Sequence, residues 1–160
     1  MLENREEAAC GFPGFPDHAR DCAIILAELK KPFPENLVRW RIGHRSGDRA
    51  MVLAYITARD VMKRLDDVVG IDGWKREHHF ANGMMLCKLS IKFGDEWVVK
   101  EDGAGETQVE AEKGGLSDSF KRAGVNFGIF RYGYYLPTSW VKVDEKGKFT
   151  SPSLPDWAKP

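Results

Sequence analysis

The sequence predicts an α+β fold: an antiparallel β-sheet, made of a hairpin and a three-stranded meander, packed with helices. Long segments with apolar residues at helical spacing alternate with groups of shorter segments that resemble strands. Within each group the turns are short and polar, as at Asn82-Gly83 and Gly94-Asp95. Because short turns join antiparallel strands, helices between such groups indicate an α+β domain.

Composition favours one folded domain in a reducing compartment. The chain has 160 residues, of which 42% are hydrophobic, enough for one core. No apolar run reaches the length of about 18 residues that a membrane span needs, and the acidic start, MLENREEAACGF, does not resemble a secretory signal. Cys10, Cys22 and Cys87 lie far apart and form no CxxC pair, which argues against a disulfide framework and a zinc site.

The first half of the chain predicts an arm, a helix and a hairpin. Residues 1–16 end in Gly-Phe-Pro-Gly-Phe-Pro and are expected to form an irregular N-terminal arm. Residues 17–31 carry an apolar stripe and end in Lys30-Lys31-Pro32, which favours a helix that stops there. Residues 37–43 and 50–56 are predicted to pair as a hairpin lined with arginines: Arg39, Arg41, Arg45 and Arg49.

A second helix and the meander follow. Thr57 and Asp60 have the spacing of a helix capping box, apolar residues continue at helical spacing, and Gly70 suits the position after the helix. Residues 74–80, 84–93 and 97–102 then predict three strands, joined at Asn82-Gly83 and Gly94-Asp95. Alternation along 84–93 indicates one buried face and one partly basic face.

The last predicted helix spans residues 108–127. Its expected buried stripe is Leu116, Phe120, Ala123 and Phe127. Two adjacent glycines, Gly114 and Gly115, oppose this helix by about 1 kcal/mol each, so a close approach of other backbone or of a ligand is expected beside them. A short strand near 140–143 should end the domain of residues 17–143, and the Pro- and Lys-rich residues 144–160 predict a flexible tail.

Basic and aromatic residues indicate nucleic-acid binding, although the net charge is zero, with 24 basic and 24 acidic residues. The cations are segregated: the hairpin arginines are followed by Lys113, by Lys121-Arg122 and by an aromatic run at 130–135 that contains Arg131. Lysine and arginine neutralise phosphates, and aromatic rings stack on unpaired bases.

Enzymatic chemistry has weaker support. The histidines at 18, 44, 78 and 79 belong to no recognisable nucleophile motif, and Gly103-Ala104-Gly105 lacks the lysine and hydroxyl of a phosphate loop. Two alternatives stay open. One is a metal-dependent nuclease that uses the acidic residues between Asp95 and Asp102. The other is an interaction module that oligomerises through a sheet edge without touching nucleic acid.

Several short motifs, in order, resemble the annealing domain of the Rad fifty-two family of single-strand annealing proteins, including its compact phage relatives of the Sak type. They are Tyr55-Ile56-Thr57 before the second helix, GIDGW after it, EDGAGE, EKGGLSDSFKRAGVNFG and FGIFRYGYYLPTSWV. Together they cover about residues 35–143. The chain departs from the family pattern at Gly114 and Val125, which implies a weaker or re-routed DNA groove. It also departs at Phe130 and Gly133, which implies a different role for the Arg131-Tyr132 segment.

The resemblance implies a protein that is not an enzyme: it binds single-stranded DNA, assembles into homo-oligomeric rings or helical filaments, and anneals complementary strands in recombination or break repair. No ATP, cofactor, metal or membrane is implied. A single-strand DNA-binding protein or an exonuclease is a further candidate partner, and the expected location is the cytoplasm, on the nucleoid or in a phage-infected host. The implied DNA-binding residues are Arg45, Arg49, Tyr55, Lys113, Lys121, Arg122 and Arg131.

Overall fold

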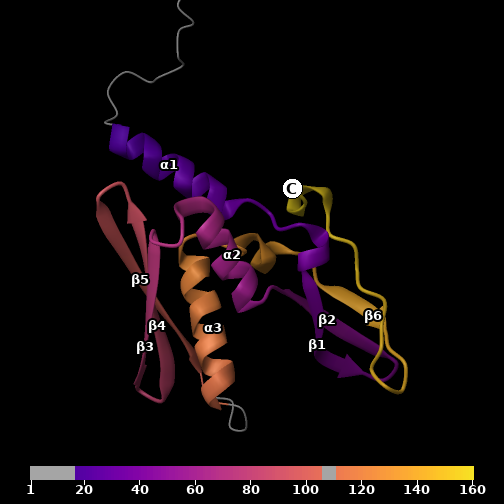
Figure 1. The fold of residues 1–160 in the computed structure, drawn as a ribbon. Coiled ribbons are helices and arrows are strands. Elements are labelled where there is room, and N and C mark those ends of the chain that lie inside the picture. Colours follow the sequence, from indigo (N-terminus) through magenta and orange to yellow (C-terminus); the bar gives the residue numbers. More distant parts are fainter. Residues whose placement is uncertain (1–16, 106–110) are drawn as a thin grey trace, which may run out of the picture.

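The computed structural model describes residues 17–105 and 111–160, and it describes residues 17–20 and 111–113 by their backbone only. The arm predicted at 1–16 lies outside the described residues. In the described part, α-helices pack with two antiparallel sheets of three strands each, which confirms the predicted α+β class. Figure 1 shows helix α3 between the two sheets, with α1 and α2 at one end.

The hairpin belongs to a sheet with the strand order β1-β2-β6. Its strands are β1 (Arg39–Ser46), β2 (Arg49–Tyr55) and β6 (Ser139–Lys142), and the short last strand pairs with β2. The register of β1 against β2 shifts between Ile42 and His44, so β1 carries a bulge at Gly43. A Cβ atom at Gly43 would lie 2.8 Å from Leu53 Cδ1, so a larger residue at the bulge would require the exposed Leu53 side chain to move.

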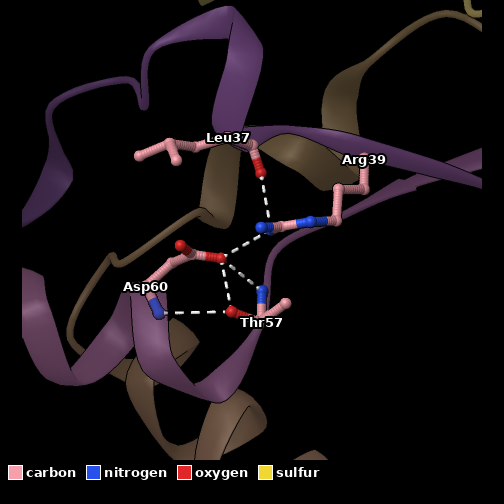
Figure 2. A network of polar contacts seen from close by, with 4 residues as sticks. All are labelled: Leu37, Arg39, Thr57 and Asp60. Carbon is pink, nitrogen blue, oxygen red and sulfur yellow. Dashed lines mark hydrogen bonds and ion pairs between the residues drawn. The ribbon is translucent and has the colours of Figure 1, made fainter.

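Helix α2 (Ala58–Val69) begins with the predicted capping box. Asp60 N–H donates to Thr57 Oγ1 at 3.3 Å, and the Asp60 carboxylate accepts from Thr57 N–H at 2.7 Å. Arg39 reaches the same carboxylate oxygen at 2.8 Å and also donates to the Leu37 carbonyl (Figure 2). This network ties the start of β1 to the start of α2, directly after Tyr55.

The meander forms the second sheet, with the order β3-β4-β5. Its strands are β3 (Trp74–Ala81), β4 (Met84–Phe93) and β5 (Glu96–Gly105). Asn82 and Gly83 both have positive φ angles, 52° and 73°, as a tight two-residue hairpin turn requires. The predicted buried face of β4 is confirmed by Cys87, Leu89, Ile91 and Phe93, which all lie in the core.

Helices α1 (Asp17–Lys30) and α3 (Ala111–Asn126) cover this buried face together with α2. Phe120, Ala123 and Phe127 are buried as predicted, but the prediction for Leu116 is wrong, because its side chain is 40% exposed. Small residues face the sheet instead. A Cβ atom at Gly115 would lie 3.2 Å from Met85 Cβ, and Ser119, one turn on, is fully buried.

The two glycines of α3 therefore differ. Gly115 permits the close approach of β4, so its neighbour is the Met85 side chain of the same chain rather than a ligand. Gly114 faces open space, because a Cβ atom at this position would meet no other element of the described chain within 4 Å.

The prediction of a flexible tail from Asp144 needs correction for its last part. Leu154 and Ala158 are buried in the core, and Leu154 N–H donates to Glu35 Oε1 at 2.8 Å. Two buried apolar residues that stand singly among prolines and polar residues give no periodic signal in the sequence. Among the helices described, none has the length and apolar character needed to cross a membrane.

Candidate nucleic-acid interface

A groove of about 610 Å³ lies between the hairpin sheet, α3 and the segment 133–138. It brings together three of the predicted DNA-binding residues: Tyr55 from the end of β2, and Lys121 and Arg122 from α3. Arg41 and the aromatic residues Trp40 and Tyr134 also line it. The groove thus combines cations with aromatic rings, the two side-chain types that bind single strands.

The packing of α3 points its basic residues at the groove. Asp118, Lys121, Arg122 and Val125 line it, and their spacing of three, four and seven residues places them on one helical face. Phe120, Ala123 and Phe127 occupy the opposite side and are buried. The hydrophobic stripe that anchors α3 therefore also fixes where Lys121 and Arg122 lie.

Both cations of α3 have carboxylate partners. Lys121 Nζ lies 2.7 Å from Asp118 Oδ1 of the same helix, and Arg122 Nε lies 3.2 Å from Asp102 Oδ1 of β5. Asp102 also accepts a hydrogen bond from Asn126 Nδ2 at 3.1 Å, which joins β5 to α3. Among the described charged residues that line the groove, Arg41, Lys121 and Arg122 are opposed only by Asp118. The groove is therefore basic despite the neutral chain.

Tyr55 is held at the groove by the capping network that follows it. Burial raises the pKa of Asp60, but hydrogen bonds from Thr57 and the nearby Arg39 outweigh burial and leave that pKa below its usual value. Asp60 is therefore a carboxylate at neutral pH and can hold Thr57 and Arg39 together. The turn from β2 into α2, which begins at Tyr55, is fixed by these bonds.

The bulge at Gly43 separates the hairpin arginines. Arg41 pairs with Leu53, whereas Arg45 pairs with Ala50, so the two side chains point to opposite faces of the sheet. Arg45 donates to the carbonyl oxygens of Gly47 at 3.1 Å and Asp144 at 3.2 Å and does not line the groove. Arg41 does line it, and the site prediction missed this residue because nothing in the sequence marks the bulge except one glycine.

Of the remaining predicted DNA-binding residues, none is among the residues described as lining the groove. Arg49 is exposed at the start of β2 and is outside the groove lining, about 13 Å along the strand from Leu53. Arg131 donates to the carbonyl oxygens of Val125 at 2.9 Å and Asn126 at 2.8 Å, so it caps the end of α3. Lys113 belongs to α3, but its side chain lies outside the described residues.

Two departures from the family pattern depend on each other. Phe130 has a positive φ of 56°, and its ring lies where a side chain at Gly133 would project, because a Cβ atom there would be 2.5 Å from Phe130 Cε1. The Tyr132 hydroxyl accepts a hydrogen bond from Phe33 N–H at 2.9 Å. Phe130 and Tyr132 thus hold the segment against the core, while Tyr134 and Tyr135 are exposed.

The geometry gives a nuclease little support. Within the described residues, no three His, Cys, Asp or Glu side chains are placed to hold one metal ion. Asp102, one of the acidic residues that the nuclease alternative would use, is already bonded to Arg122 and Asn126. His78 and His79 point to opposite faces, with His78 bonded to the Leu116 carbonyl and His79 3.7 Å from Glu101.

Comparison with known proteins identifies the family to which the chain belongs. The family model described as Rad52/22 family double-strand break repair protein matches residues 21–149. A single-stranded DNA-binding protein DdrA from Deinococcus deserti is 38% identical over 142 residues, which are 85% of this chain and 70% of that protein. The DdrA protein of Deinococcus radiodurans is 36% identical over 142 residues, 85% of this chain and 68% of that protein. The family resemblance seen in the sequence is confirmed, and the chain belongs to the Rad52/Rad22 family of double-strand break repair proteins.

Proposed function

We propose that this chain binds single-stranded DNA in the groove between the hairpin sheet and α3, and that it anneals complementary strands during recombination or break repair. The observation that carries the proposal is the convergence of Tyr55, Lys121 and Arg122 on one basic groove. Membership of a break-repair family and similarity to proteins named for single-stranded DNA binding support it. The proposed activity needs no ATP, cofactor, metal or covalent step.

In this proposal the cations grip the backbone and leave the bases to a second strand. Lys121, Arg122 and Arg41 neutralise phosphates, which gives binding that does not depend on sequence. Tyr55 and the exposed ring of Tyr134 offer surfaces on which a base can stack. Edges of stacked bases stay free, so an incoming strand can test them for complementarity.

The energy for annealing comes from the DNA. Each stacked base-pair step contributes about 1.4 kcal/mol, and this gain accumulates along a correct duplex. The ion pairs of Lys121 and Arg122 with aspartates keep the protein's grip on phosphates moderate, because each phosphate must displace a carboxylate. Duplex can therefore replace protein contacts without fuel.

Assembly into a homo-oligomeric ring or helical filament is part of the proposal. A repeated subunit would join its groove to the next and present one track to a long strand. Zero net charge favours association between copies, because no overall repulsion opposes it. The proposed location is the cytoplasm, and a single-strand DNA-binding protein or an exonuclease remains a candidate partner.

The test is annealing of two labelled complementary oligonucleotides in EDTA, without nucleotide, at two salt concentrations. The protein should accelerate annealing, and the acceleration should fade with salt. The double variant Lys121→Ala/Arg122→Ala should lose most of it. Lys63→Ala is the matched control, because Lys63 pairs with Asp67 on another helix and lies outside the groove.

Two outcomes would point elsewhere. Magnesium-dependent loss of labelled DNA would favour the nuclease alternative. Assembly of the folded protein without any salt-sensitive DNA shift would favour an interaction module. Normal annealing by the double variant would contradict the site assignment but leave the activity standing.

A further inference from the structure

The turn between α2 and β3 exposes an apolar side chain within an acidic surround. Ile71 is 85% exposed, more than any other large hydrophobic residue in the described part of the chain. Residues 66–73, DDVVGIDG, contain three aspartates and no lysine or arginine, and all three aspartates are exposed. We call Ile71 with Asp66, Asp67 and Asp72 the acidic knob. A single exposed isoleucine is common on protein surfaces, so it indicates an interaction site only if a complementary surface exists.

A second groove, of about 360 Å³, has the opposite character. It lies between α1, β5 and the end of α3. Its described lining consists of apolar side chains, Asn126 and three cations, with no carboxylate among them. The cations are Lys30, Lys100 and Arg131, one from each side of the groove. We call it the cationic groove. An apolar floor with a cationic rim suits a partner that presents an apolar tip with an acidic rim.

Single-stranded DNA fits the cationic groove less well than a protein side chain does. Its aromatic residues, Phe93 and Phe127, are only 4% and 2% exposed, so neither ring offers an open face to a base. Leu26 and Val98 form its more accessible apolar lining. Arg131 is already bonded to two carbonyl oxygens, which fixes its guanidinium at the rim.

The knob precedes β3 and the cationic groove includes residues of β5, and β3 and β5 are the two edge strands of one sheet (strands labelled in Figure 1). Trp74 of β3 pairs with Ile91 of β4, and Ile91 pairs with Val98 of β5, so the three residues form one row across the sheet. Ile71 lies three residues before Trp74, at the β3 end of the row. Val98, at the β5 end of the row, lines the cationic groove. A chain therefore presents the two surfaces in opposite directions, as a contact between successive copies requires.

We propose that the acidic knob of one copy docks in the cationic groove of the next. The occupant is a second copy of this chain, chosen because an apolar tip flanked by aspartates complements an apolar floor flanked by three cations. Asp67 is already paired with Lys63 at 2.8 Å, so Asp66 and Asp72 supply most of the negative charge. The two surfaces differ, so the contact is heterologous and repeats head to tail, which closes a ring or continues as a filament. This inference rests on the assembly part of the proposed function but not on DNA binding.

The experiment is sedimentation velocity of the full chain, without DNA, over a range of protein concentrations. The knob variant Ile71→Asp and the groove variant Lys30→Glu/Lys100→Glu should each be monomeric where the original chain is assembled, with association weakened more than tenfold. An equimolar mixture of the two should form a one-to-one dimer and nothing larger, because it contains one intact knob facing one intact groove. Ile24→Asp is the matched control, since Ile24 is 58% exposed on α1 and outside the groove lining.

Thermal unfolding of each variant should match that of the original chain, and Ile71→Ser provides a milder replacement if Ile71→Asp fails to fold. The proposal is overturned if the original chain is monomeric, if Ile71 variants assemble normally, if Ile24→Asp is equally disruptive, or if the mixture stays monomeric. Binding of a short oligonucleotide is measured on the same samples. Assembly as expected without DNA binding would remove the proposed function and leave this interface standing.

Discussion

Replacing Asp118 with asparagine is expected to tighten the binding of single-stranded DNA. Asp118 lines the groove and lies 2.7 Å from Lys121 Nζ, so in the free protein it occupies the cation that would hold a phosphate. DNA must displace this carboxylate before Lys121 can bind it. Asparagine keeps the shape of the side chain but removes the charge, so it should release Lys121 without rebuilding the groove.

The magnitude follows from the cost of breaking the ion pair. Lys121 and Asp118 are three residues apart on a helix, with side chains that are 27% and 58% exposed. Such partly exposed pairs contribute about 0.2–1 kcal/mol. If binding no longer has to offset this energy, affinity rises by a factor of roughly 1.5 to 5. The salt dependence should also steepen, by up to about 0.7 in the logarithmic slope for a single strand, because Lys121 then makes a full phosphate contact.

The assay is fluorescence anisotropy with a short labelled oligonucleotide at several salt concentrations. Glu28→Gln is the matched control, because it frees Lys31 from a pair that also spans three residues, and both residues lie outside the groove. The control should leave affinity unchanged. Weaker binding by Asp118→Asn, or equal tightening by both variants, would refute the competition argument.

Three further predictions concern the frame around the groove. Gly114→Ala should raise the free energy of unfolding in urea by up to about 1 kcal/mol. Gly115→Ala should raise it less, because the new Cβ atom would lie 3.2 Å from Met85 Cβ. Equal increases for the two variants would contradict the packing described. The pKa of Asp60 is lowered in the folded chain, so its ionised form contributes stability at neutral pH that is lost as pH falls below about 4. Asp60→Asn should therefore flatten the acid limb of a plot of unfolding free energy against pH, and an unchanged acid limb would count against the network. Arg131→Ala should lower the unfolding free energy by about 1 kcal/mol, because its hydrogen bonds to the end of α3 are lost. Oligonucleotide affinity should stay nearly unchanged. Weaker oligonucleotide binding with unchanged stability would instead support Arg131 as a DNA-binding residue.

Much of the fold could be predicted because its signals are local. The Thr57–Asp60 capping box, the Asn82-Gly83 turn and the alternation along β4 each act within a few residues, and the structure contains all three. Lys121 and Arg122 could be placed on a helix face by spacing alone. The exposure of Leu116 could not be predicted, because it depends on how closely α3 approaches β4. The close approach at Gly115 decides which helical face touches the sheet.

The sequence by itself determined the class of fold, the order of the elements and the side-chain chemistry of the groove, since helical periods, strand alternation and caps are short-range properties. Only the tertiary structure decided which residues meet. The bulge at Gly43 turns Arg45 away from the face of Arg41, and the fold brings Arg122 to Asp102 across twenty residues of sequence. It also buries Leu154 and Ala158 in one core with residues far from them in the chain. These contacts depend on the register of strands and on the distance between packed surfaces, and neither quantity is encoded within any single segment.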